Sequence, residues 1–515
     1  MLRNNLPAAS GLWDAATLNK ENYTVKLLIG LLTVIVIIYC SSLNWRRSIK
    51  AVLFILVIEG ALRKWVLPQA SDMIYFLKDF VLLGAYLKYY IFSNERKFSI
   101  KNNMLTILIF LITGWCLLQA FNPSLGSPII GIFGLKSYLW YIPLIWMVPN
   151  LFQSEDDLYR FLRLYLLLAI PVGVLGIVQF FSPPLSPINL YAPGEVTDVA
   201  TLLVGGVAFA RITGTFSYLD GYAVYLIVCF GLLLPFLFIR QSKWWWLITV
   251  ANLLLITINS LMTGSRSVVF ASALFLLGYL GFKGFTHPSR MFRSLSQFFL
   301  PALIISIALF TWFQPAIDAF WLRTTSTQDI PARIANTITQ PFEFSQYKDF
   351  DGYGAGATHP GGQALRSALN LPNGEDIPVY YEEEPGRVVL ELGPIGFVFW
   401  YGLRIRILIE LWRVFWKLKR PFLRQLALAI FLIQAIQLND HLVFHHTFSM
   451  YYWFLTGFIF LLPRLEKIET WRQNQQNLQQ NVIFTYFPGS FYKYPNILLI
   501  YIIGSSLVSC FYYLG

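Results

Sequence analysis

Apolar runs of membrane-spanning length recur along this chain and constrain its fold more than any other feature. Several segments are free of charge for the roughly 17 to 25 residues that a helix needs to cross a bilayer. Only 13% of the 515 residues are charged, too few to cover a soluble protein of this size, whereas 56% are apolar. The sequence therefore predicts an all-α integral membrane protein, a polytopic bundle of about 12 to 14 transmembrane helices. The predicted spans are residues 25–41, 51–67, 74–92, 104–121, 137–152, 160–181, 221–239, 244–262, 266–282, 297–314, 390–412, 422–438, 447–463 and 496–512.

Three long polar connections divide the predicted bundle. Residues 182–220 are rich in Pro, Gly and acidic residues, residues 315–389 form the largest loop, and residues 465–495 contain the run RQNQQNLQQN. The first 25 residues are polar and precede the first apolar run, so no cleavable signal peptide is predicted. The expected organisation is a polar N-terminal segment (1–24), transmembrane helices 1–10 with the outer loop 182–220 (25–314), a large extracytoplasmic loop (315–389), transmembrane helices 11–13 (390–464), a cytoplasmic Gln/Asn-rich linker (465–495) and a final transmembrane helix (496–515).

Basic residues give the chain a formal net charge of +12, yet they fall in short clusters between apolar runs. Such clusters are typical of orientation signals on the cytoplasmic side, so no nucleic-acid partner is expected. One side of the bundle collects the clusters at 46–50, 96–101, 160–163, 240–243, 283–293, 404–424 and 464–472. The long loops 182–220 and 315–389 and the turn at 263–266 then lie on the opposite, outer side.

Metal binding receives little support from the sequence. The four cysteines all lie inside apolar segments and lack metal-like spacing. His441 and His445 are four residues apart, a spacing that can place two ligands on one helix face, but no clear third ligand accompanies them. We therefore expect no metal site and no cofactor.

Four cations on the outer side sit at the expected edges of the membrane: Lys136, Arg211, Arg266 and Arg387. Taken singly, each is explained by a side chain that snorkels to the interface. Taken together, cations that converge on one face repel one another unless an anionic ligand joins them. Because the planar fork of arginine suits phosphate oxygens, these residues are candidates for binding a diphosphate carried on a polyprenyl lipid.

The large outer loop holds a glycine-rich stretch at 351–358 and an acidic run at 382–384. The glycines lack the strand and helix that frame a nucleotide-binding loop, so a flexible loop that lets backbone approach a substrate fits better. The acidic run is either a solvated patch or supplies a carboxylate that acts as general base on a hydroxyl nucleophile. Within the membrane, Glu59 with Arg63, and Lys78-Asp79 in the next helix, are interpreted as ion pairs that make buried charge tolerable.

Three short motifs carry a resemblance to a known family. The sequence RITGTF at 211–216 precedes a span, TGSRS at 263–267 lies between two spans, and ELGPIG at 391–396 follows the large outer loop. In this order, and with a common outer side, they resemble the O-antigen ligase and polymerase superfamily. GLKSYL at 134–139 and the helix with Lys78-Asp79 resemble its polysaccharide-polymerase branch. The resemblance extends over most of the chain, from about the second predicted span to the thirteenth.

The resemblance implies a GT-C-like, inverting and metal-independent glycosyltransferase. Such enzymes take a glycan from a polyprenyl diphosphate on the outer face of the bacterial inner membrane and pass it to an acceptor hydroxyl. By position, Arg211 and Arg266 inherit the diphosphate-binding role, and Lys136 and Arg387 are additional candidates.

One departure from the family pattern affects the choice of catalytic base. Ligases of this family carry a histidine shortly before the E-x-G-x-x-G motif, where this chain has the acidic run instead. We therefore predict Glu384 or Glu382 as the base in the catalytic loop 315–389. His359, the only histidine in that loop, is the alternative. The missing histidine favours a polymerase over a lipid-core ligase.

The expected partners are a polyprenyl-diphosphate-linked oligosaccharide, a saccharide or lipid acceptor, membrane lipid and other polysaccharide export proteins. The product would be O-antigen, capsule or exopolysaccharide. Two alternatives belong to other classes: a flippase or exporter of the lipid-linked oligosaccharide, and a non-catalytic membrane subunit of a polysaccharide assembly machine. A transporter needs polar residues toward both faces, whereas the motifs here gather on one, so the enzyme is favoured.

Overall fold

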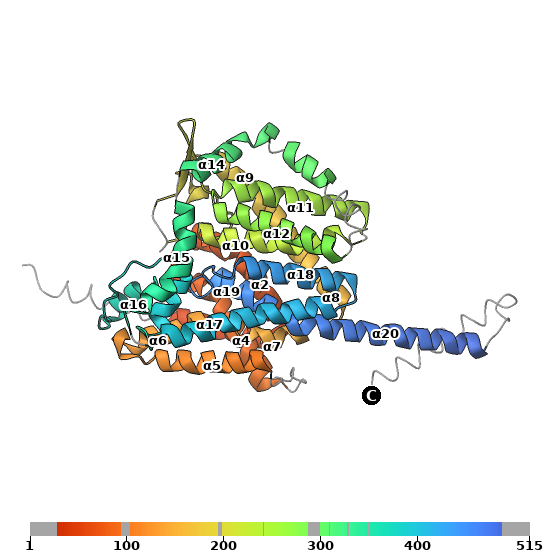
Figure 1. The fold of residues 1–515 in the computed structure, drawn as a ribbon, viewed down its shortest axis with the longest axis horizontal. Helices are drawn as coiled ribbons and strands as arrows, with labels where there is room; N and C mark the ends of the chain where they lie inside the picture. Colours follow the sequence, from red (N-terminus) through yellow and green to blue (C-terminus); the bar gives the residue numbers. More distant parts are fainter. Residues whose placement is uncertain are drawn as a thin grey trace, which may run out of the picture.

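The computed structural model describes residues 28–93, 103–193, 198–239, 241–286, 299–307, 310–326, 329–348 and 350–486. This part of the chain is almost entirely helical, and Figure 1 shows most of the long helices lying side by side with their axes close to one direction. The helices are α2 (Trp45–Ala61), α3 (Ser71–Tyr75), α4 (Leu77–Tyr86), α5 (Met104–Gln119), α6 (Pro128–Leu139), α7 (Leu144–Met147), α8 (Glu155–Leu167), α9 (Ala169–Phe181), α10 (Leu219–Leu237), α11 (Lys243–Met262), α12 (Arg266–Thr286), α14 (Gln314–Ser326), α15 (Asp329–Phe344), α16 (Gly362–Leu369), α17 (Glu384–Lys417), α18 (Pro421–Ile436), α19 (His446–Thr456) and α20 (Phe458–Tyr486). Two strands, β1 (Thr201–Val204) and β2 (Val207–Ala210), form an antiparallel hairpin. Short 3-10 or π-helical turns lie at Leu62–Val66, Pro68–Ala70, Leu87–Phe92, Pro123–Leu125, Val148–Asn150 and Pro187–Asn189.

Six described helices are long and apolar enough to cross a membrane, or seven if the bent pair Phe299–Trp312 and Gln314–Thr325 counts as one span. The six are Pro128–Asn150, Glu155–Phe181, Leu219–Leu237, Lys243–Met262, Arg266–Gly284 and Glu384–Lys417. Three shorter apolar helices accompany them: Leu28–Leu43, Met104–Gln119 and Pro421–Ile436. The described chain is thus that of an all-α, polytopic membrane protein. Within it, fewer helices reach full spanning length than the roughly 12 to 14 that the sequence predicts.

Several predicted spans fall short because charge or a break interrupts the apolar run. The run at 51–67 carries Glu59, Arg63 and Lys64 and ends in a π-helical turn. The run at 447–463 is split at Gly457, between α19 and α20. The predicted N-terminal segment 1–24 and final helix 496–515 lie outside the described residues.

Helix α10 lies in the core of the bundle and is buried along nearly its whole length. A helix that is apolar around its entire circumference is stable only when neighbours cover it on all sides. For α10 those neighbours include α8, α11, α12, α18 and α19. Gly231 permits the close approach of α18, because a Cβ there would lie 2.7 Å from Cγ1 of Ile433.

The 182–220 segment, the turn at 263–266 and the large loop 315–389 meet at one end of the bundle, called here the loop end. The 182–220 segment reaches the turn between α11 and α12, where Nε of Arg211 donates to the carbonyl of Thr263 at 2.9 Å. Arg366 of α16 donates from Nη2 to the carbonyl of Leu125 at 2.8 Å, which ties the large loop to the α5–α6 connection. In Figure 1 this end is on the left, where α15 and α16 lie. The large loop 315–389 therefore contains α14, α15 and α16 rather than irregular chain alone.

A break inside α17 organises the loop end. Gly393 adopts φ 67° and ψ 176°, a backbone conformation that glycine tolerates and other residues rarely adopt. A Cβ at this position would also lie only 2.0 Å from the carbonyl oxygen of Phe350. Pro394 follows and has no N–H to continue the helical ladder, so the break coincides with the ELGPIG motif.

The carbonyl groups before the break bind the glycine-rich stretch 351–358. The backbone N–H of Tyr353 donates to the carbonyl of Leu390 at 2.7 Å, and that of Gly354 to the carbonyl of Glu391 at 2.9 Å. Most of the stretch is buried. Its glycines therefore serve close packing against α17, and the stretch is not the flexible loop that the sequence suggested.

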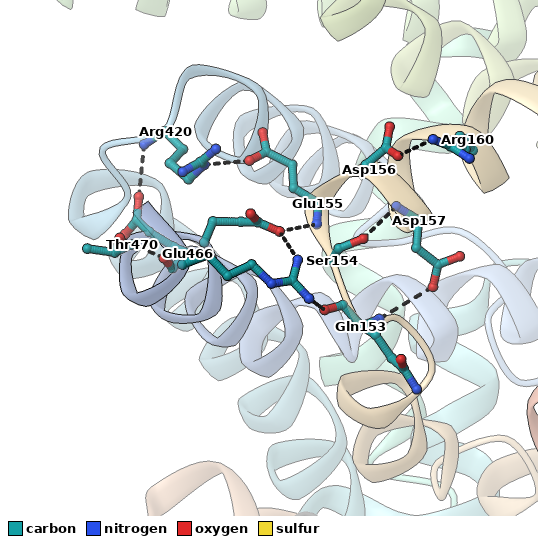
Figure 2. Close-up of polar contacts among 11 residues, drawn as sticks. Gln153, Ser154, Glu155, Asp156, Asp157, Arg160, Arg420, Glu466 and Thr470 are labelled. Atoms are coloured by element: carbon teal, nitrogen blue, oxygen red, sulfur yellow. Dashed lines mark hydrogen bonds and ion pairs between the residues drawn. The ribbon is translucent and has the colours of Figure 1, made fainter. Parts of the chain in front are cut away.

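One ion pair and several hydrogen bonds join three helices at the opposite end of the bundle. Figure 2 shows Arg420, just before α18, paired through Nε with Glu155 at the start of α8 at 2.5 Å. The backbone N–H of Glu155 donates to Oε1 of Glu469 in α20 at 3.1 Å, and Glu466 of α20 accepts from the backbone N–H of Arg420 at 2.8 Å. The acidic first turn of α8, at residues 155–157, also complements its helix dipole.

Helix α20 continues past this network and leaves the body of the protein, as Figure 1 shows on the right. The predicted linker 465–495 therefore begins as a helix that reaches Tyr486. Along its projecting part, Trp471 and Leu478 are largely exposed.

Candidate functional site

The motifs RITGTF and TGSRS meet at the loop end. Arg211 binds the carbonyl of Thr263 through Nε, and Arg266 follows within the same turn as the first residue of α12. Gly264 between them has φ +61°, and a Cβ there would lie 3.2 Å from Nε of Arg211 and 2.9 Å from Leu202. Burial, followed by the charge of Arg323, lowers the pKa of Arg211, but a guanidinium stays charged at physiological pH. The two arginines that the sequence selected for a diphosphate thus lie on adjoining segments.

A buried lysine supports the chain just after Arg211. Nζ of Lys64 donates to Oγ1 of Thr213 at 3.0 Å and to the carbonyl of Gly214 at 2.9 Å. Among the described residues Lys64 has no carboxylate partner, although its side chain is buried. Gln179 fixes the same chain from the other side, accepting from the N–H of Gly214 at 2.8 Å. The Lys64 ammonium is thus held by neutral oxygens close to the arginine motif.

Tyr75 is surrounded by three cations. Arg63, Lys78 and Lys136 lie 5.0, 4.7 and 5.5 Å from its ring centroid. Each of these distances is within the range in which a ring face attracts a cation.

The carboxylates near Tyr75 pair across helices. Glu59 of α2 binds Lys78 of α4 at 2.8 Å, and Asp79 of α4 binds Lys136 of α6 at 2.8 Å. Arg63 donates to Oγ of Ser71 and of Ser217. The predicted pairs within one helix are thus replaced by pairs that join neighbouring helices.

Arg387 heads a hydrogen-bonded chain that ends at a buried carboxylate. Its Nε donates to Oγ1 of Thr358 at 3.2 Å, and its Nη2 donates to the Thr358 carbonyl at 2.6 Å. Oγ1 of Thr358 donates in turn to Oε1 of Glu391 at 2.8 Å. Glu391 also accepts from the Thr358 N–H at 2.8 Å and from the hydroxyl of Tyr138 at 2.9 Å. Thr358 thus joins Arg387 to the buried carboxyl of Glu391.

His359 follows Thr358 and is held as a neutral ring. Its Nδ1 accepts from the N–H of Gly361 at 3.0 Å, which leaves the proton on Nε2. Burial, followed by the charges of Arg387 and Lys136, lowers the pKa of His359 to about 4. In this tautomer Nε2 carries the proton and cannot accept one, and it has no hydrogen-bond partner among the described residues.

A pocket of about 370 Å³ opens beside Arg387. Its polar lining comes from the large loop and from the start of α17, and Tyr381 contributes an aromatic wall. The lining residues used below are Thr358, His359, Gln363, Arg366, Tyr381 and Arg387, and together they define the Arg387 pocket.

The acidic run lies beside this pocket but does not line it. Glu384 is fully buried at the start of α17, where Oε1 pairs with Nη1 of Arg404 at 2.8 Å and Oε2 accepts from the N–H of Val443 at 3.0 Å. Glu382 is about half-exposed and pairs with Arg333 at 3.0 Å. Both oxygens of Glu384 are thus engaged, whereas Glu382 is accessible. The assignment of the base among Glu384, Glu382 and His359 stays a prediction.

The structure places the two remaining histidines of the sequence analysis in separate environments. Nε2 of His441 lies 2.8 Å from the carbonyl oxygen of Glu382, and Nδ1 of His445 accepts from the N–H of Phe448 as the cap of α19. No group of three or more metal-ligating side chains occurs among the described residues.

Contacts link these cations into one band, the basic belt, across the loop end. Lys64 and Arg63 both bind the 213–217 segment that follows Arg211. Arg63 shares the Tyr75 ring with Lys136, and the charges of both Lys136 and Arg387 act on His359. The basic belt comprises Arg63, Lys64, Lys78, Lys136, Arg211 and Arg387.

Sequence reasoning missed several members of this site. Lys64, Tyr75, Thr358 and the role of Glu391 were not selected, because each acts through contacts with residues far away in the chain. The only available signal was the unusual presence of a charged residue such as Lys64 inside an apolar run.

The fold and site define an α-helical, polytopic membrane protein with a basic belt at one end. Comparison with protein-family models and with curated proteins finds no match for this chain.

Proposed function

We propose that the protein is a membrane glycosyltransferase that transfers or polymerises saccharide units from a polyprenyl diphosphate. The observation that carries this proposal is the basic belt, in which Arg211 and Lys64 bind only neutral oxygens among the described residues. Such cations retain the capacity to bind an anion, and their position at the loop end suits the headgroup of a lipid. The resemblance of the surrounding motifs to the O-antigen ligase and polymerase superfamily supports the same conclusion. The site would then face the outside of the bacterial inner membrane.

Transfer requires a C–O bond to form as another breaks. The acceptor hydroxyl attacks the anomeric carbon, the bond from that carbon to the diphosphate breaks with inversion, and the hydroxyl proton passes to a base. Negative charge grows on the departing diphosphate, so fixed cations bind it more strongly in the transition state than in the ground state. Arg211 and Arg266 are the proposed contacts to that charge, and Lys136 and Arg387 extend the belt toward the acceptor side.

The protonation state and the partners of the three candidate side chains narrow the choice of general base. His359 holds its proton on Nε2 and has a pKa of about 4, so it is a weak base near neutral pH. Glu384 reaches a substrate only if its pair with Arg404 opens. Glu382 needs only to leave Arg333 on the surface. Among the three, Glu382 is therefore the preferred base.

The test is incubation of the purified protein in liposomes with a polyprenyl-diphosphate oligosaccharide. We expect longer glycans or a glycosylated acceptor together with released polyprenyl diphosphate. Arg211→Ala and Arg266→Ala should abolish the product while the amount of inserted protein stays unchanged, and Glu382→Gln should bind donor without turnover. Movement of intact donor across the bilayer without any new glycosidic bond would contradict the proposal and identify a flippase.

A further inference from the structure

We propose that the Arg387 pocket binds a sugar that carries a single carboxylate, such as a hexuronate, within the glycan that the enzyme handles. This inference rests on the proposed function for its biological setting, because it assigns a saccharide to the glycosyltransferase site. The pocket itself is defined by residues that are independent of Arg211 and Arg266.

The guanidinium of Arg387 is held rigidly with one corner open. Nε and Nη2 are both occupied by Thr358. The face of the group lies 3.5 Å from the ring centroid of Phe444. Among the described residues no acceptor lies within hydrogen-bond distance of Nη1, although the side chain is only 8% exposed. Nη1 is not one of the fully buried unpartnered atoms, so it opens toward the pocket, where a ligand or water can accept its hydrogen bond.

The charged residues that line the pocket favour an anion. Arg387 and Arg366 line the pocket, and neither has an ion-pair partner among the described residues. The adjacent carboxylate is Glu391, which is buried below Thr358 and reaches Arg387 only through that hydroxyl. The lining of the pocket therefore holds two guanidiniums and no carboxylate, which favours an anionic ligand.

A diphosphate matches this pocket less well than a carboxylate. Both terminal nitrogens of Arg366 already donate to carbonyls, those of Pro372 and Leu125, so Arg366 supplies charge rather than a free fork. A diphosphate carries more than one charge and is better matched by the several cations around Arg211.

The rest of the lining suits a sugar ring. A pocket of about 370 Å³ is at the lower end of the range that holds small molecules. Tyr381 offers an aromatic wall for the apolar face of a pyranose, and Gln363 and Thr358 offer groups that both donate and accept hydrogen bonds. A hydroxylated ring with one carboxylate uses each of these features.

The test compares methyl glucuronide with methyl glucoside, which differ only in the charged group, for binding to the purified full-length protein in nanodiscs. We expect the glucuronide to bind at least about tenfold more tightly, the difference typical of a charge-assisted hydrogen bond. Arg387→Gln should remove the preference, and Arg366→Gln should reduce it severalfold. Lys348→Gln removes a charge from a surface ion pair with Glu375 outside the pocket and should retain the preference.

Equal affinity for the two glycosides, or a preference that survives in a folded Arg387→Gln protein, would overturn the inference. Displacement of the glucuronide by inorganic pyrophosphate in an Arg211→Ala background would also overturn it, because the pocket would then be a phosphate-binding site. The proposed function fails separately: glucuronide binding with no transfer from any lipid-linked donor refutes the enzyme and leaves the pocket. Transfer of neutral glycans by a protein that does not bind the glucuronide would refute the ligand assigned to the pocket and leave the proposed enzyme.

Discussion

Two groups of arginines, one at each end of the bundle, have different kinds of partner. In the network of Figure 2, each arginine has a carboxylate: Arg420 pairs with Glu155, and Arg160 pairs with Asp156 one turn away. At the loop end, Arg211 and Arg387 bind carbonyl or hydroxyl oxygens instead. A pair of opposite charges satisfies itself, whereas a cation held by neutral oxygens is positioned without being neutralised. The first arrangement stabilises the fold, within a helix or between helices, and the second leaves room for an anion.

The loop end also contains an ion pair, Glu384 with Arg404. Breaking this pair should have the largest effect of the substitutions considered. Replacing Glu384 by Gln leaves the guanidinium of Arg404 buried without its counter-charge, which should cost about 3 to 5 kcal/mol of stability. Replacing both residues by Met should cost much less. Thermal unfolding in detergent measures the difference, with Glu382→Gln as the surface control. A Glu384→Gln protein of normal stability that fails to transfer glycan would instead identify Glu384 as the base.

Arg211 tests the second arrangement. Its replacement by Ala should lower glycan transfer by about 10²- to 10³-fold, the size of losing one preorganised donor to a developing negative charge. Stability and insertion should be unchanged because no carboxylate loses its partner. The matched control is Arg472→Ala at the opposite end, which breaks an exposed pair with Glu469. The readout is product length in proteoliposomes. Equal losses of glycan transfer in both variants would show that arginines paired with carboxylates and arginines held by neutral oxygens matter alike.

His359 provides a pH test of the loop end. The pKa of about 4 in the folded protein lies below the unfolded value near 6.5, so between these pH values the unfolded chain binds the extra proton. Stability should therefore decrease as the pH falls through this window, by at most about 1.4 kcal/mol per pH unit from this group. His359→Asn retains an acceptor for Gly361 and should flatten the slope of melting temperature against pH. An unchanged slope would show that His359 is charged in the folded state.

Arg420 carries the smallest expected effect. Its pair with Glu155 is partly exposed, so Arg420→Ala should cost no more than about 1 kcal/mol and leave glycan transfer at the normal rate. Melting temperature at low and high salt measures the first quantity. A large loss of transfer in a stable Arg420→Ala protein would mean that the opposite end communicates with the site.

The general class of the fold could be predicted from the sequence, because the length of each apolar run and the position of each basic cluster are visible in a single stretch of the chain. Full-length spans were harder to identify, since charged residues inside an apolar run, such as Glu59 and Lys64, are tolerated only through partners on other elements. Those partners are invisible to a scan of one segment. For the large loop, no helix was predicted, although the strong amphipathic pattern of α15 supports a helix that packs on α17.

The site was partly predictable for the same reason. Arg211 and Arg266 could be selected as cations left on the outer side, and the structure places their segments together. Thr358 and Glu391 form a connection that depends on the break at Gly393, which brings residues of the glycine-rich stretch onto α17. No local pattern specifies which carbonyl a distant N–H will reach. The pairing of Glu384 with Arg404 was hidden in a similar way, although the two are only five or six turns apart on one broken helix.

Helix α20 offers a practical handle for imaging. It leaves the body at the opposite end from the basic belt and continues as one helix to Tyr486. A helical fusion partner joined in register at the exposed stretch around Trp471 and Leu478 would inherit its direction, since each added residue advances and rotates by a fixed amount. Such a rigid marker would enlarge the particle for electron cryomicroscopy and show its orientation in each image, without altering the residues of the basic belt.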